Sequence, residues 1–144
     1  MSRYWIGVAS GEHIKAGVAG GFAQLSHGRL DPILKLSTGD WIAYYSPRSK
    51  MTDGDAVQAF IAIGKVKAGE AYRVSQGKVF RPFRRDVAYR RTTETAPMSE
   101  LRDKLSFTQG RGSHWGMAFR RGVFEVSRED FALIARKMKV RMLR

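Results

Sequence analysis

The chain is built from short apolar runs separated by glycine, proline and polar turn residues. Runs rich in aromatic or β-branched residues predict strands at 4–10, 40–47, 56–66 and 122–126. The segments 72–74 and 78–91 supply one or two more strands. Because proline cannot donate to a sheet, Pro82 makes the last strand an edge strand or a bulged one. Many short strands favour a curled sheet or a small barrel.

Helices are predicted between and after these strands. The segment 11–19 has the composition of a short helix that ends at the Gly20 and Gly21 pair. A second helix, 98–105, is expected behind Pro97, followed by a glycine-rich loop at 107–116. The last helix begins at Ser127, which forms a capping box with Asp130 and precedes an apolar stripe of Phe131, Ile134 and Met138. The pattern predicts an α+β fold with helices packed outside the sheet.

Length and cysteine content limit the class of protein. A length of 144 residues is typical of one domain, so residues 1–144 are interpreted as a single domain. No apolar run approaches the roughly 20 residues that cross a bilayer, and the first residues lack the apolar core of a secretion signal. Without cysteine, no disulfide or thiolate site can form. We expect a cytoplasmic protein, active as a monomer.

The charge balance favours polyanionic partners. The chain carries 26 Lys and Arg against 13 Asp and Glu, a formal charge of +13. Residues 78–144 hold 17 of the basic residues and 7 of the acidic ones. Arginine suits phosphate contacts because of its planar fork, and the candidates are Arg84, Arg85, Arg90, Arg91, Arg120 and Arg121. The alternative is a basic surface that serves only solubility; a membrane surface fits less well, because no basic amphipathic helix is evident.

Catalytic and metal-binding motifs are missing from the sequence. The three histidines are scattered, with no HExxH spacing, and no GxSxG elbow or phosphate-binding glycine loop occurs. Asp53 and Asp55 lie in turn-like sequence, where aspartate often serves the local backbone. We therefore expect no metal, no cofactor and no catalysis.

The segment GVAGGFAQLSHGR, residues 17–29, places glycines beside one phenylalanine. Glycine lets the backbone approach another surface closely, so something is expected to lie against this segment. Phe22 offers a stacking face and Gln24 an amide edge, which together suit a nucleobase. By contrast, Trp5, Trp41 and Phe60 lie inside apolar runs and are predicted to be core residues.

Five segments taken in order resemble one family. YWIGVAS, GVAGGFAQLSHG, GDWIAYYSP, FIAIGKV and HWGMAFRRGVFEVSREDFALI together are similar to the EVE domain family over nearly the whole chain. The resemblance implies a PUA-like β pseudo-barrel with peripheral helices, related to the YTH domains that read N6-methyladenine in RNA. It also implies a concave pocket for a flipped or single-stranded base, often a modified one; bacterial members are proposed to recognise modified DNA bases.

The resemblance also assigns candidate pocket residues. Phe22 resembles the first aromatic of the base cage, which is tryptophan in the YTH relatives. Ser10 resembles the serine on the polar side of the pocket, and the second-strand wall corresponds to Tyr44, Tyr45 and Ser46. Phe83 and Trp115 are the candidates for a second cage aromatic. Gln24 and His27 are assigned to the pocket from their donor and acceptor capacity.

The sequence thus predicts a module that binds DNA or RNA carrying a modified base and does no chemistry on it. Two alternatives stay open. One is a general RNA-binding PUA-like protein that uses only shape and charge. The other is an enzyme or small-molecule binder that uses the same pocket.

Overall fold

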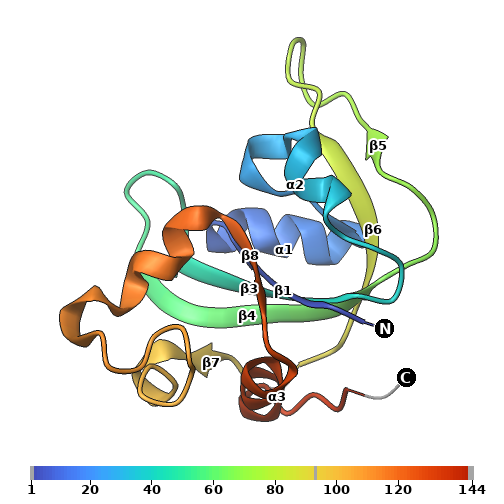
Figure 1. Ribbon diagram of the computed structural model, residues 1–144. Helices are drawn as coiled ribbons and strands as arrows, with labels where there is room; N and C mark the ends of the chain where they lie inside the picture. The colour runs from blue at the N-terminus through green and yellow to red at the C-terminus, as the bar shows by residue number, and fades with distance from the viewer. Residues whose placement is uncertain (1, 93, 143–144) are drawn as a thin grey trace.

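A computed structural model describes residues 2–92 and 94–142 and shows a mixed sheet curled into a half-barrel (Figure 1). The strand order is β2-β6-β4-β3-β1-β8, with β5 paired to β6 and β7 to β4. Only the β1–β3 pair is parallel among these strands. The strands are β1 Tyr4–Val8, β2 Phe22–Ala23, β3 Trp41–Arg48, β4 Ala56–Val66, β5 Tyr72–Arg73, β6 Phe83–Tyr89, β7 Ala96–Pro97 and β8 Val123–Val126. The expected α+β class is confirmed.

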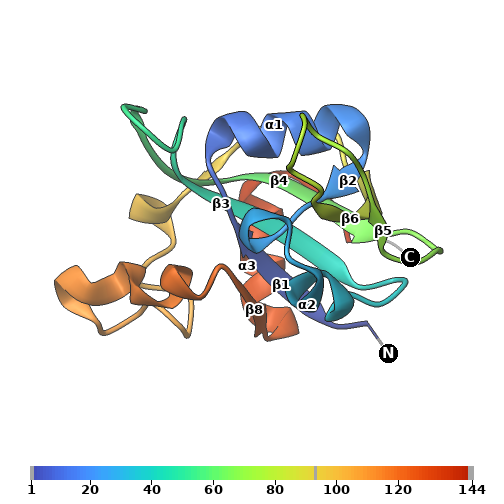
Figure 2. The same cartoon turned by 90° about the horizontal axis from the view of Figure 1, so that it is seen from above.

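Helices cover both faces of the sheet. The α-helices are α1 Gly11–Gly20, α2 Leu30–Leu34 and α3 Arg128–Lys137. Two short 3₁₀ helices occur at Ser26–Gly28 and Met98–Glu100, and a long one at Gly112–Arg121. In Figure 1, α1 and α2 lie above β4 and α3 lies below it. Figure 2, seen from above, shows α1 and the long 3₁₀ helix on opposite sides of β3.

Two apolar cores flank the central strands. One core lies between the sheet and α3 and contains, from β3, the side chains of Trp41, Ala43 and Tyr45. The other lies between the sheet and α1 and α2 and contains Ile42 and Tyr44. Successive residues of a strand point to opposite faces, so the unbroken apolar runs of β3 and β4 reflect burial on both sides. The expected core residues Trp5, Trp41 and Phe60 are all buried.

Helix α1 follows its sequence signals. The Ser10 hydroxyl accepts from the His13 backbone N–H at 3.3 Å and caps the first turn. Gly21 ends the helix in the left-handed region, at φ 72°. The predicted helix 11–19 is therefore confirmed and one residue longer.

Helix α3 keeps only half of the expected capping box. The Ser127 hydroxyl accepts from the Asp130 backbone N–H at 3.1 Å. The Asp130 carboxylate instead accepts from the backbone N–H of Ser106 at 3.0 Å and from the Ser106 hydroxyl. This carboxylate therefore ties α3 to the preceding segment, while the predicted stripe is fully buried at Phe131, Ile134 and Met138.

The predicted helix at 98–105 is wrong. A 3₁₀ helix at Met98–Glu100 is followed by turns, although Leu101 and Leu105 are buried as their spacing suggested. The Thr108 hydroxyl donates to the Arg102 carbonyl at 2.8 Å, which closes the chain back on itself instead of letting a helix continue. The predicted loop at 107–116 is also partly wrong, because a 3₁₀ helix begins at Gly112.

Candidate nucleic-acid interface

The glycines of α1 are where Phe22 packs. A Cβ atom on Gly17 would lie 2.8 Å from the Phe22 carbonyl oxygen, and one on Gly20 would lie 2.5 Å from the Cε2 atom of its ring. Only a bare helix surface lets β2 approach this closely. The residue that lies against these glycines is Phe22 of the same segment, and its ring is half-buried. That another molecule lies against the segment 17–29 stays a prediction.

Arg84 of β6 covers the ring of Phe22. Its guanidinium carbon lies 3.7 Å from the ring centroid, and its Nε donates to the Gln24 side-chain oxygen at 2.9 Å. A planar guanidinium stacks on an aromatic face much as a base does. The ring therefore has a face that accepts a flat, hydrogen-bonding group.

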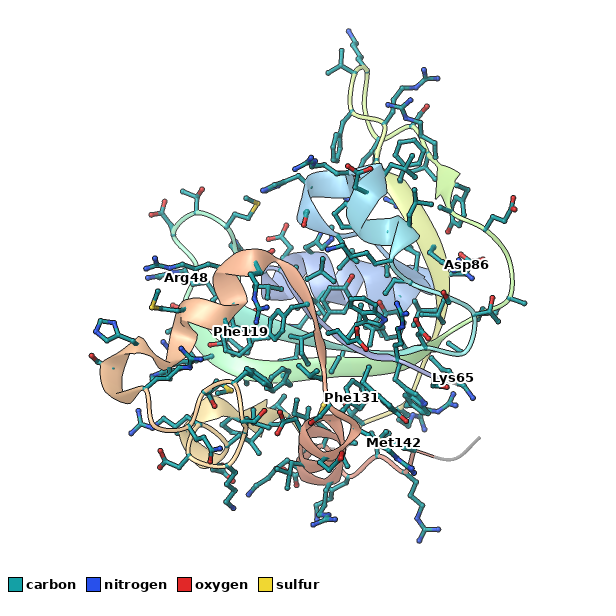
Figure 3. The ribbon with its side chains drawn as sticks, in the orientation of Figure 1. Arg48, Lys65, Asp86, Phe119, Phe131 and Met142 are labelled. Atoms are coloured by element: carbon teal, nitrogen blue, oxygen red, sulfur yellow. The ribbon has the colours of Figure 1, made fainter. Side chains whose placement is uncertain are left out.

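Two further side chains, Tyr72 and Asp86, lie beside Phe22, Gln24 and Arg84. Sheet register pairs Tyr72 of β5 with Arg84, and Phe22 of β2 with Asp86. The Tyr72 hydroxyl donates to the Asp86 carboxylate at 2.6 Å, and Figure 3 shows Asp86 on the outer side of β6. Partial burial and this hydrogen bond raise the pKa of Tyr72 to about 12. We call these five residues the Arg84 cluster: Phe22, Gln24, Tyr72, Arg84 and Asp86.

A narrow hollow with no room for a water molecule lies under the cluster. It is lined by His13, Ile14, Gly17, Phe22, Gln24, Tyr44 and Tyr89. The Gln24 carbonyl is contacted by His13 Nε2 at 3.1 Å and accepts from the Tyr44 hydroxyl at 3.4 Å. The hollow is therefore polar as well as aromatic.

The two tyrosines of the hollow stay neutral. Burial raises the pKa of Tyr44 and of Tyr89 well above the ordinary value of 10.0. The Tyr89 hydroxyl donates to the Phe22 carbonyl at 2.8 Å, which holds β2 in place. These walls offer hydroxyl groups and no charge.

We predict that alkaline pH destabilises the protein. Burial also raises the pKa of Tyr45 to about 12, whereas each of these phenols ionises near 10.0 in the unfolded chain. The unfolded state then binds fewer protons, so this contribution to stability is intact below pH 10 and is lost as the pH rises through about 12. Urea midpoints measured from pH 8 upward should fall above pH 10.

Tyr45→Phe provides the internal comparison for that experiment. It removes one buried phenol, so the alkaline fall in the urea midpoint should be smaller than in the wild type. Lysines also lose their protons in this pH range, but this affects the wild type and the Tyr45→Phe variant equally. A midpoint that stays level up to pH 11.5 in the wild type would contradict the prediction.

The nine predicted pocket residues do not form one pocket. Phe22, Gln24 and Tyr44 line the hollow described above. Ser10 caps α1, and the fully buried Ser46 donates its hydroxyl to the Arg48 carbonyl at 2.8 Å. Both serine hydroxyls are therefore engaged with the local backbone.

Tyr45 lies on the opposite face of β3 from Tyr44. Its ring stacks on Phe119 at 3.8 Å between centroids, in the other core. Figure 3 shows Phe119 at the far end of the sheet from Asp86. Trp115 lines a hollow on that side, together with Tyr45 and Arg120. Tyr45 and Trp115 are thus separated from the Arg84 cluster.

His27 and Phe83 lie together in a third place. Both line a hollow between the segment 27–31 and the hairpin that joins β5 to β6. Phe83 is covered by the guanidinium of Arg73 at 4.8 Å. The aromatic side chain that shares the Arg84 cluster with Phe22 is Tyr72, which was not among the predicted residues.

The six predicted phosphate-binding arginines have different surroundings. Arg84 belongs to the cluster. Arg85 donates to Thr38 Oγ1 at 2.8 Å and to the carbonyls of Leu36 and Lys67 at 3.2 and 3.3 Å, so it joins loops to β6 and is unsuited to a phosphate. Arg90 lies over Trp41, and Arg121 lies over Phe124. Arg91 and Arg120 are exposed to solvent.

The positive charge is locally uncompensated. Within residues 2–92 and 94–142, Lys137 and Glu100 form the single ion pair within 4.0 Å. The same part of the chain holds no group of three acidic or histidine residues placed to bind a metal. None of its helices is long and apolar enough to cross a membrane. An uncompensated cationic surface attracts polyanions.

Comparison with known proteins gives consistent matches. The family model of the EVE domain matches residues 3–137. The UPF0310 protein YdcG of Bacillus subtilis is 45% identical over 96% of this chain and 94% of its own length. The UPF0310 protein msl3206 of Mesorhizobium japonicum is also 45% identical, over 96% of this chain and 93% of its own. Rpa0253 of Rhodopseudomonas palustris, known from an NMR structure, is 15% identical with a TM-score of 0.57 over 95% and 93% of the two chains.

Proposed function

The chain belongs to the EVE domain family, which has a PUA-like fold and is generally linked to nucleic-acid binding, and on this premise we propose what it binds. It takes one base of a DNA or RNA strand, a base carrying a small modification such as a methyl group, into the Arg84 cluster. Domains of this family are generally binding modules, and we propose no reaction on the bound base. A cytoplasmic location and a monomeric state stay predictions from the sequence.

The stacking of Arg84 on Phe22 is the observation that carries this proposal. The guanidinium occupies an aromatic face and bonds to the Gln24 amide, which are the two contacts that a base would use. A base that displaces it would stack on Phe22 and meet the freed edge of Gln24. Arg84 would then lie beside the nucleotide, where its charge can contact the phosphate.

Magnitudes show why the pocket needs the basic surface. A stacked base contributes about 1 to 3 kcal/mol, while displacing Arg84 costs a cation–π contact of about 0.5 to 2 kcal/mol. The net gain from stacking is therefore small, and phosphate contacts must supply much of the affinity. A buried methyl group adds about 0.8 kcal/mol, or roughly fourfold in affinity. Stronger discrimination requires that the unmodified base leave a polar group unpaired.

The test is a binding panel read by fluorescence anisotropy. Single-stranded DNA and RNA oligonucleotides of one sequence would carry either plain bases, N6-methyladenine or 5-methylcytosine. We expect one or more modified strands to bind at least about fourfold more tightly than the plain strand of the same sequence. Equal affinities throughout would overturn modified-base recognition and favour general binding. Nucleosides that bind where oligonucleotides do not would favour a small-molecule site.

Arg84→Ala should remove one phosphate contact and also the cost of displacing the guanidinium from Phe22, so the salt dependence of binding is the informative measurement. The slope of a plot of log affinity against log salt concentration should become shallower by about 1, the change expected for one lost phosphate contact. The ratio between modified and plain strands should persist, because Phe22 and Gln24 remain. Arg136→Ala removes the same charge from the exposed surface of α3, on the other side of the sheet, and should change the slope far less. Identical slopes for the two variants would contradict a phosphate contact at Arg84.

A further inference from the structure

The hairpin between β5 and β6 projects from the top of the molecule in Figure 1 and carries an unusual set of side chains. Residues 73–83 contain no acidic residue and three basic ones, Arg73, Lys78 and Arg81. At its tip, Val79 is 90% exposed and Phe80 is 41% exposed. An exposed aromatic ring such as Phe80 among cations is typical of a surface that binds single-stranded nucleic acid.

A hollow of about 420 Å³ lies between this hairpin and the segment 27–31. Its volume falls in the range of ordinary ligand sites. The basic residues that line it are His27, Arg29, Arg73 and Arg81, the aromatic ones are Phe80 and Phe83, and Asp31 is the acidic residue that faces it. Aromatic rings and arginines therefore lie together in this hollow, as they do in the Arg84 cluster.

The backbone holds the two walls of this hollow together. Gly28 has φ 80°, and a Cβ atom there would lie 2.3 Å from Cβ of Pro82, so the segment packs directly on the hairpin. Ser26 and His27 also have positive φ, at 46° and 62°, which non-glycine residues adopt at a cost. This backbone places His27, which is exposed, at the edge of the hollow.

The hollow and the Arg84 cluster lie on opposite faces of one two-stranded ribbon. Along β5, Tyr72 joins the cluster while Arg73 lies over Phe83 in the hollow. Along β6, Phe83 and Arg84 divide in the same way. Within the described residues β5 pairs with β6 alone, so a nucleic-acid strand could pass around its other edge from one face to the next.

We infer that this hollow is a second nucleotide site, which binds a neighbouring nucleotide of the strand whose modified base occupies the Arg84 cluster. Phe80 is the stacking platform, and Arg29, Arg73 and Arg81 contact the phosphates. The inference rests on the proposed function for its first site. The ligand is single-stranded, because a paired base would not expose its face to Phe80.

The experiment measures anisotropy for single strands of one, three, five and nine nucleotides that carry the preferred base, and for their plain partners. In the wild type, affinity should rise sharply once the strand is long enough to reach the hollow. Phe80→Ala should weaken the nonamer by about 5- to 150-fold and leave the mononucleotide unchanged. Met51→Ala, which truncates another exposed apolar residue, is the matched control and should change neither.

The outcomes separate the two sites. If Phe80→Ala weakens every length equally, or weakens none, the second site is overturned. If the length effect persists but modified and plain strands bind alike, the proposed function fails while the second site stands. Because Phe80 is exposed at a hairpin tip, the Phe80→Ala variant should keep the wild-type circular dichroism spectrum. Arg81→Ala is a second, independent test: it should lower the affinity for the nonamer and leave that for the mononucleotide unchanged.

Discussion

Replacing Phe22 with alanine is expected to abolish the preference for a modified over a plain oligonucleotide and to weaken the preferred strand by at most about 70-fold, because the stacking energy that is lost is partly offset by the cation–π contact that the base no longer has to displace. The ring is the stacking face of the proposed site, and Arg84 now covers it at 3.7 Å. Without the ring, neither the base nor the guanidinium has a face to stack on. Anisotropy with matched modified and plain strands measures both effects.

Two other variants make the Phe22 experiment decisive. Phe22→Trp keeps a stacking face and should retain the preference. Trp115→Ala removes a half-buried aromatic from the separate hollow beside Tyr45, and should leave the preference intact. Loss of the preference in the Trp115 variant, or equal loss for modified and plain strands in the Phe22 variant, would show that the pocket lies elsewhere.

The strands were predictable because their signals are local. The run 56–66 matches β4 to the residue, and 122–126 contains β8. The segment 98–105 misled because Leu101 and Leu105 satisfy a helical spacing while a chain of turns buries them equally well. The turns are closed by the Thr108 hydroxyl on the Arg102 carbonyl and are tied to α3 by the Asp130 carboxylate bonded to Ser106, and the spacing of the two leucines contains neither contact.

The pocket was only partly predictable, and the reason differs from residue to residue. Tyr44 and Tyr45 were assigned together, yet consecutive residues of a strand face opposite sides, so period two already separates them. The same rule divides Arg84 from Arg85. Tyr72 was missed because β5 has only two residues, and its pairing with Arg84 follows from a hairpin register that the sequence does not mark.

Phe22 was the residue that the sequence marked most clearly. Its signal was the surrounding glycine, and the structure shows the physical cause: Gly17 and Gly20 have no Cβ atoms where Phe22 lies. The ring is neither sealed in a core nor free in solvent, since it is half-buried and shared with Arg84. A half-buried aromatic against bare backbone is well suited to exchange one flat partner for another.

Gly28→Ala is expected to destabilise the fold by about 2 to 5 kcal/mol, the largest stability loss we predict. Two costs combine at this residue. The left-handed backbone at φ 80° costs an alanine about 1 to 2 kcal/mol. The new methyl group would also lie 2.3 Å from Cβ and 2.8 Å from Cα of Pro82, and such overpacking costs about 1 to 3 kcal/mol.

Two other glycines separate these costs when unfolding is measured in urea. Gly39 has φ 88° with nothing within 4 Å of a Cβ atom, so Gly39→Ala carries the backbone cost alone. Gly116 has neither a positive φ nor a close neighbour, so Gly116→Ala should be close to neutral. The order of stability should therefore be Gly116→Ala, then Gly39→Ala, then Gly28→Ala. Equal losses at Gly28 and Gly39 would mean that the segment 27–31 yields to the added methyl, and that the hollow beside the hairpin is not rigidly built.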